Sequence, residues 1–158
     1  MWWRALAFAL ALALAYAYVC RSPRPGVEVI QTGLEAFRFD QLLERCPLLV
    51  PDAVADLPAV LRAWFAWNFV GPTTASPPSA AGASKFLVVH AGPAKAPVEV
   101  VNPAHPDLVL RVILPAHALL VVPYLWRAAF PTSGEPDGPT VTPVDDAATL
   151  ALRLVLGG

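Results

Sequence analysis

The stretch SKFLVVHAGPAKAPVEVVNPAHPDLVLRVILPAHALLVV, residues 84–122, decides the fold. Short apolar runs recur in it and are separated by glycine, proline or asparagine, which predicts β-strands joined by turns. Residues 126–130 and 149–156 are expected to add two strands. Many short strands at this spacing favour a mainly β (α+β) fold, a β-sandwich or jelly-roll-type barrel. The four runs in the quoted stretch are residues 85–90, 98–101, 108–114 and 118–122.

Two helices and two strands are predicted before this stretch. Residues 27–32 and 48–50 are typical of strands. Residues 39–46 predict a short helix that Asp40 caps and Pro47 ends. A second helix is predicted from an Asp56 cap to about Asn68, with Trp67 widening its apolar stripe. That stripe has helical spacing and indicates core packing; it contains Leu57, Val60, Leu61, Trp64 and Phe65.

Composition limits the classes of function. Hydrophobic residues make up 56% of the 158 residues, charged residues make up 15%, and the net charge is −1. A disordered chain and a nucleic-acid binder that neutralises phosphates are therefore both excluded. The two cysteines, Cys20 and Cys46, are too few for a disulfide framework or a zinc knuckle. Pro-rich, loop-like composition predicts flexible loops near 71–84 and 131–146.

The amino-terminal residues 1–24 predict a membrane anchor ahead of a domain at 25–158. Residues 5–20 carry no charge and lie between Arg4 and Arg21. Such a run with interfacial aromatic residues predicts one transmembrane helix and a single-pass membrane location. A cleaved signal peptide with its site at residues 15–17 is the alternative, and it would make the protein secreted. The expected anchor side chains are Trp2, Trp3, Leu6, Phe8, Leu10, Leu12, Leu14, Tyr16, Tyr18 and Val19.

The candidate metal ligands are few. The chain has three histidines, and the only His-x-Asp pair is His105 with Asp107. The sequence around that pair is typical of a turn, and so is the sequence around His117. A seven-residue strand between His105 and His117 would separate them by about 20 Å. We therefore expect no catalytic residue, no cofactor and no bound metal.

Three segments resemble cupin-like proteins related to the JmjC group, as found among small proteins of large DNA viruses of algae and protists. The segments are FRFDQLLERCPLLVPDAV (37–54), SKFLVVHAG with VEVVNPAH (84–105), and VILPAHALLVVPYLWRAAF (112–130). The resemblance implies a cupin-like β-sandwich. Its enzymes hold iron with an HxD or HxE pair and a distal histidine, and they bind 2-oxoglutarate. Arg127 and Ala128 stand here where the distal histidine would be.

These observations together predict a membrane-anchored, non-catalytic structural or interaction protein. A virion or viral membrane component, with other proteins and the lipid bilayer as partners, is the expected setting. No nucleic acid and no small-molecule substrate is expected. The alternative is an iron and 2-oxoglutarate oxygenase with an abbreviated ligand set, for which His105, Asp107 and His117 are the only candidate ligands.

Overall fold

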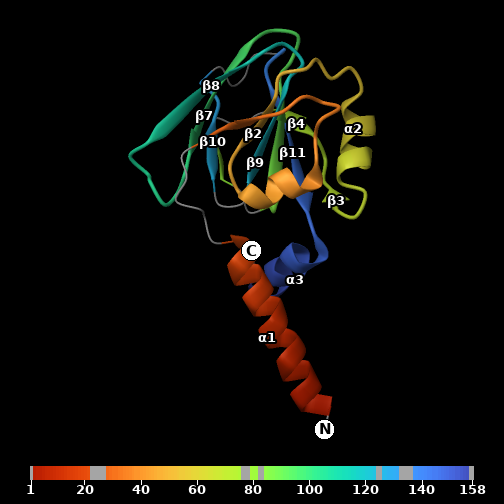
Figure 1. Ribbon diagram of the computed structural model, residues 1–158. Coiled ribbons are helices and arrows are strands. Elements are labelled where there is room, and N and C mark those ends of the chain that lie inside the picture. Colours follow the sequence, from red (N-terminus) through yellow and green to blue (C-terminus); the bar gives the residue numbers. More distant parts are fainter. Residues whose placement is uncertain are drawn as a thin grey trace.

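The computed structural model describes residues 2–21, 28–75, 79–81, 84–123, 126–131 and 137–156 (Figure 1). Helices in this part are α1 (Trp2–Arg21), α2 (Leu57–Trp64), α3 (Ala147–Leu156) and the 3-10 helix η1 (Phe39–Glu44). The strands are β1 (Ile30–Gln31), β2 (Leu48–Val50), β3 (Phe69–Val70), β4 (Thr74–Ala75), β5 (Ser79–Ala81), β6 (Phe86–His90), β7 (Ala96–Val101), β8 (Val109–Leu114), β9 (Leu119–Pro123), β10 (Arg127–Ala129) and β11 (Thr140–Asp145).

The strands form two sheets. The larger sheet has the order β1-β2-β9-β6-β11-β3, and β4 also pairs with β11. The smaller sheet has the order β5-β10-β7-β8. The pairing of β1 with β2 is parallel, and the other pairs are antiparallel. Strands β6 and β9 therefore lie in the middle of the larger sheet, where both edges of each strand are hydrogen-bonded.

Two apolar cores lie on the two faces of the larger sheet. Alternate residues of a strand point to opposite faces, so Val89 of β6 contributes to one core and Val88 to the other. The first core fills the space between the two sheets and includes Trp126. The second core lies under η1 and α2 and includes Phe65. The fold is thus a layer of helix and loop, the larger sheet, and the smaller sheet.

Local sequence explains where α2 and η1 begin and end. The Asp56 carboxylate accepts a hydrogen bond from the Ala59 backbone N–H at 2.9 Å, which confirms Asp56 as the cap of α2. The helix ends at Trp64, however, and not near Asn68. In η1 the expected Asp40 cap is wrong, because Arg38 occupies the cap position and its N–H donates to the Gln41 side chain at 3.0 Å.

Three elements expected after residue 70 are wrong: two loops and the last strand. The expected loop at 71–84 contains β4 and β5, and the one at 131–146 contains β11. Strand β11 could not be predicted from the sequence because it contains Pro143, and proline lacks the backbone N–H that a central strand uses for pairing. Strand β3 pairs only with Val144 and Asp145 of β11, so Pro143 lies just beyond the end of this pairing. The Gly71 N–H, which follows β3, donates to the Pro143 carbonyl at 2.8 Å. The expected last strand at 149–156 is the helix α3.

The predicted fold class is also wrong in its membrane-spanning helix. No helix in the described part of the chain is both long enough and apolar enough to cross a bilayer. The sixteen charge-free residues 5–20 give about 24 Å of helix, against a hydrocarbon core of about 30 Å. Alanine, which is weakly hydrophobic, occupies every second position from Ala5 to Ala17. The predicted single-pass membrane location is wrong for the same reason. The side chains of residues 16–21, including the Cys20 thiol, lie outside the described part.

Candidate functional site

His105 and Asp107, the His-x-Asp pair considered as candidate metal ligands, lie in the turn between β7 and β8. The His105 N–H donates to the Asn102 carbonyl at 2.9 Å, and the Leu108 N–H donates to the His105 carbonyl at 3.0 Å. The Asn102 side chain, which is fully buried, accepts from the Ala104 N–H at 2.9 Å. These bonds hold the backbone in consecutive turns. The Asp107 side chain is exposed.

The third candidate, His117, lies at the opposite end of the β7–β8 hairpin. The register pairs Val101 with Val109 at the end that carries His105 and Ala96 with Leu114 at the other end, after which the chain reaches His117. The structure therefore does not bring His105 and His117 together. Among the described residues, no group of three or more His, Cys, Asp or Glu side chains has a geometry that could hold a metal.

His117 instead lies near His90, which ends β6. The ring centroids of the two histidines are 6.0 Å apart. The backbone of His117 adopts a left-handed conformation with φ of 59° and accepts from the Val54 N–H at 2.9 Å. Burial lowers the pKa of His90, and a charge on His117 lowers it further, while hydrogen bonds to the backbone of Val54 and His117 oppose these effects. The site therefore favours a neutral His90 imidazole.

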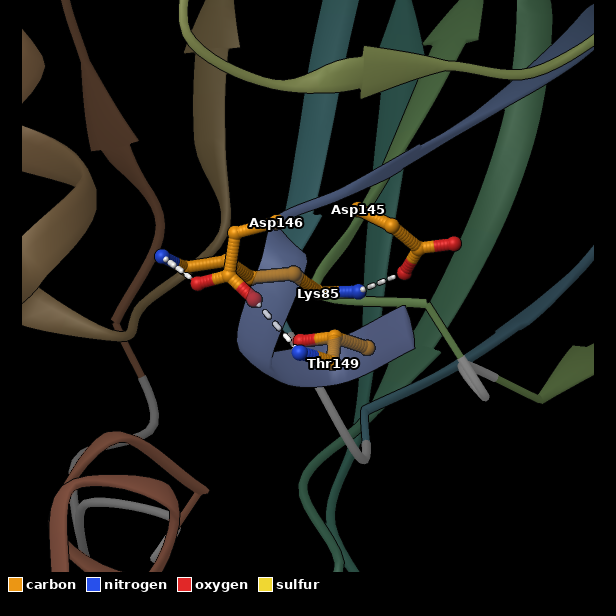
Figure 2. Close-up of polar contacts among 4 residues, drawn as sticks. All are labelled: Lys85, Asp145, Asp146 and Thr149. Carbon is orange, nitrogen blue, oxygen red and sulfur yellow. Dashed lines mark hydrogen bonds and ion pairs between the residues drawn. The ribbon is translucent and has the colours of Figure 1, made fainter. Parts of the chain in front are cut away.

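A second polar cluster joins the start of β6 to the junction of β11 and α3 (Figure 2). The Lys85 ammonium lies 2.6 Å from Oδ2 of Asp146, with both side chains mostly buried. The other Asp146 oxygen, Oδ1, accepts from the Thr149 N–H at 2.7 Å and so caps α3. The Asp145 carboxylate accepts from the Lys85 backbone N–H at 3.0 Å.

The geometry of this cluster suits a structural role better than proton transfer. Burial by itself raises the pKa of Asp146, but the hydrogen bonds from Lys85 and Thr149 outweigh it and lower the pKa. Both oxygens of Asp146 are engaged within the chain, and its carboxylate is held ionised against a charged lysine. A general acid or base would instead need a pKa near the working pH. The cluster fixes α3 onto the larger sheet.

An aromatic groove lies beside the carboxyl end of α2. Its volume is about 260 Å³. The Trp67 side chain is 96% exposed and the Phe39 side chain is 44% exposed. By contrast, the Trp64 ring is held in place by stacking on the Phe37 ring, at a centroid distance of 3.8 Å and an angle of 18°. The groove is lined by Phe39, Ala63, Trp64, Ala66, Trp67 and Asn68.

Sequence reasoning missed this groove because it placed Trp67 on the core side of a longer helix. Continued helical geometry would put Trp67 next to Val60. The helix ends at Trp64, and residues 65–67 form a turn in which the Asn68 N–H donates to the Phe65 carbonyl at 2.9 Å. Phe65 thus enters the core while Trp67 faces solvent. An aromatic residue just past a helix end is the signal that points to such a surface.

The groove is the strongest candidate for a binding site in the described part of the chain. Its lining carries no ionisable side chain and combines a rigid ring with an exposed ring. No protein-family model matches this sequence, and no curated protein is significantly similar to it. The fold and the groove therefore define a class only: a sheet-rich protein with an uncharged aromatic surface groove. The resemblance to cupin-like proteins stays a prediction.

Proposed function

We propose that this protein is a non-catalytic interaction module that binds an extended, proline-containing segment of another protein in the aromatic groove. The observation that carries the proposal is the nearly complete exposure of Trp67 beside the fixed Trp64 ring. Tryptophan is enriched among the residues that dominate binding energy at protein interfaces. Its ring combines a large apolar surface with one N–H donor.

The chemistry of the lining favours a polyproline-type ligand. Proline-rich segments dock in aromatic-lined grooves, because their left-handed helix forms before binding and loses little entropy. The carbonyl groups of such a helix have no internal partner and accept hydrogen bonds. The indole N–H groups of Trp64 and Trp67 and the Asn68 amide are the side-chain donors in the groove lining.

The same lining argues against two other ligand classes. A charged ligand would find no opposite charge among the six lining residues. A small polar ligand needs several convergent polar groups for orientation, and Asn68 is the only lining residue with a polar side chain apart from the two indoles. An uncharged segment that packs rings and methylene groups on Trp64 and Trp67 fits both observations.

The test is fluorescence polarisation of a labelled ten-residue alanine–proline peptide titrated with the full chain. A glycine–serine peptide of equal length is the control ligand. We expect saturable binding of the proline peptide only. Trp67→Ala should weaken it about tenfold or more, with an unchanged melting temperature because the side chain is exposed. Ile113→Ala, which removes an exposed apolar side chain from β8, should leave the affinity unchanged.

Two results would refute the proposal. The first is the absence of saturable binding at protein concentrations up to about 1 mM, the weak end of measurable affinities. The second is equal affinity of Trp67→Ala and the unmodified chain for the proline peptide. Equal binding of the two peptides would also count against it, because the lining is argued to select proline rings.

A further inference from the structure

Helix α1 presents an apolar surface of a size that a folded chain rarely leaves exposed. It extends away from the two sheets, with α3 alongside the end nearer to them (Figure 1). Residues 5–20 carry no charge, and every residue from Trp2 to Ala15 is exposed. A helix that is apolar on all sides is normally buried. Its large exposed side chains are Trp2 (91%), Trp3 (68%), Leu6 (74%), Phe8 (68%), Leu10 (60%), Leu12 (55%) and Leu14 (51%).

We propose that α1 pairs with α1 of a second copy of this chain. The proposal is independent of the peptide groove, which lies at α2. A helix of twenty residues is about 30 Å long. If half of the exposed area of its seven large side chains is buried on each copy, the pair removes on the order of 1,000 Å² from water. That area reaches the lower limit for a specific interface of about 1,000 Å².

The side chains of α1 are arranged to fit another copy. Leu6, Leu10 and Leu14 recur every four residues and form one ridge along the helix. The neighbouring row Ala5, Ala9 and Ala13 has the same spacing and forms a shallow groove. When ridges of this spacing on two helices interdigitate, the helices pack in the class most common in globular proteins. Since one helix carries both the ridge and the groove, a twofold pair satisfies both copies at once.

Two other occupants fit the observations less well. A bilayer-spanning arrangement is not supported, because no helix in the described part of the chain is both long enough and apolar enough to cross a membrane. The chain's own sheets do not cover α1, because the helix runs away from them (Figure 1). A second copy is the occupant for which the helix itself supplies matching length, matching spacing and an uncharged contact surface.

The test is sedimentation velocity of the full chain from about 1 to 100 μM. We expect a species of twice the 16.8 kDa chain mass. Leu10→Glu, in the middle of α1, should shift the chain to monomer. Leu10→Ala should raise the dissociation constant about tenfold, and circular dichroism should show both variants folded, because Leu10 is 60% exposed. The matched control is Ile113→Glu, which places the same charge on β8 at a side chain 68% exposed.

Four results would overturn the proposal. They are a monomer across the whole concentration range, a dimer that Leu10→Glu leaves intact, a dimer that Ile113→Glu dissociates, and a polydisperse mixture of large species. Phosphatidylcholine vesicles form a separate arm. Flotation of the chain with these vesicles, together with a monomer in their absence, would assign α1 to a lipid surface instead of a second copy.

Discussion

Replacement of Trp126 tests the core between the two sheets. The side chain is fully buried among residues of β6, β7, β9 and β10, and its indole N–H has no hydrogen-bond partner among the described residues. Two effects therefore oppose each other at this position. The ring stabilises the fold by burial, while an unpaired buried donor costs about 1–3 kcal/mol.

Two substitutions of Trp126 distinguish the contribution of ring burial from the cost of the unpaired N–H. Trp126→Ala removes the whole ring and should lower the free energy of unfolding by about 3–5 kcal/mol. At roughly 2–4 °C per kcal/mol for a chain of this size, the melting temperature should fall by roughly 6–20 °C. Trp126→Phe keeps most of the apolar volume and removes the unpaired N–H. Its net effect should therefore stay within about 1 kcal/mol.

Urea unfolding followed by far-ultraviolet circular dichroism measures both variants without relying on tryptophan fluorescence. The slope of free energy against urea concentration should be the same in all three proteins, so that midpoints can be compared directly. If Trp126→Phe proves as destabilising as Trp126→Ala, the indole N–H contributes a favourable interaction and the reasoning fails. An unchanged midpoint for Trp126→Ala would show that the ring is not part of the core.

Two further predictions concern the polar groups. Burial lowers the pKa of His90 in the folded state, so the unfolded state binds more protons at mildly acidic pH. Stability should therefore decline as pH falls below the ordinary histidine pKa of about 6.5. His90→Gln should flatten this decline, as measured by the melting temperature between pH 7.5 and 5. Asp146→Asn keeps a residue that can cap α3 but leaves the Lys85 ammonium without its carboxylate, and it should cost about 1–3 kcal/mol at pH 7 in urea unfolding. The pKa of Asp146 is lowered in the folded state, so the stability lost in Asp146→Asn should be fully present above the ordinary aspartate pKa of about 3.9. The difference between the two proteins should vanish as pH falls through the lowered pKa. A difference that persists in strong acid would contradict the role of the ion pair.

The strands of residues 84–122 could be predicted within about two residues, because β-branched runs there are bounded by glycine, proline and asparagine. Strand β11 could not, because Pro143 is unusual in a central strand and is tolerated only where β3 has ended. Residues 149–156 are a short apolar run, for which strand and helix are ambiguous. The Asp146 cap was the available signal for a helix.

The candidate site was less predictable than the strands. The turn at His105 follows from local asparagine and proline chemistry. The approach of His90 to His117 depends on the pairing of β6 with β9, which no local pattern specifies. The position of Trp67 depends on where α2 ends, and helix ends are set by tertiary packing as much as by sequence. The amino-terminal run illustrates the same limit, because an apolar composition does not by itself separate a membrane helix from an exposed one.

The strand order of the larger sheet has a consequence for synthesis on the ribosome. Its middle strands come from distant parts of the chain: Leu48 pairs with Val121, and Val88 pairs with Thr142. The sheet therefore cannot close until β11, which ends at Asp145, has left the exit tunnel. Such non-local pairing slows folding, whereas the β7–β8 hairpin can form as soon as it emerges. Helix α1 precedes every strand of both sheets in the sequence, and so its apolar surface is accessible to a chaperone while those strands are still being synthesised.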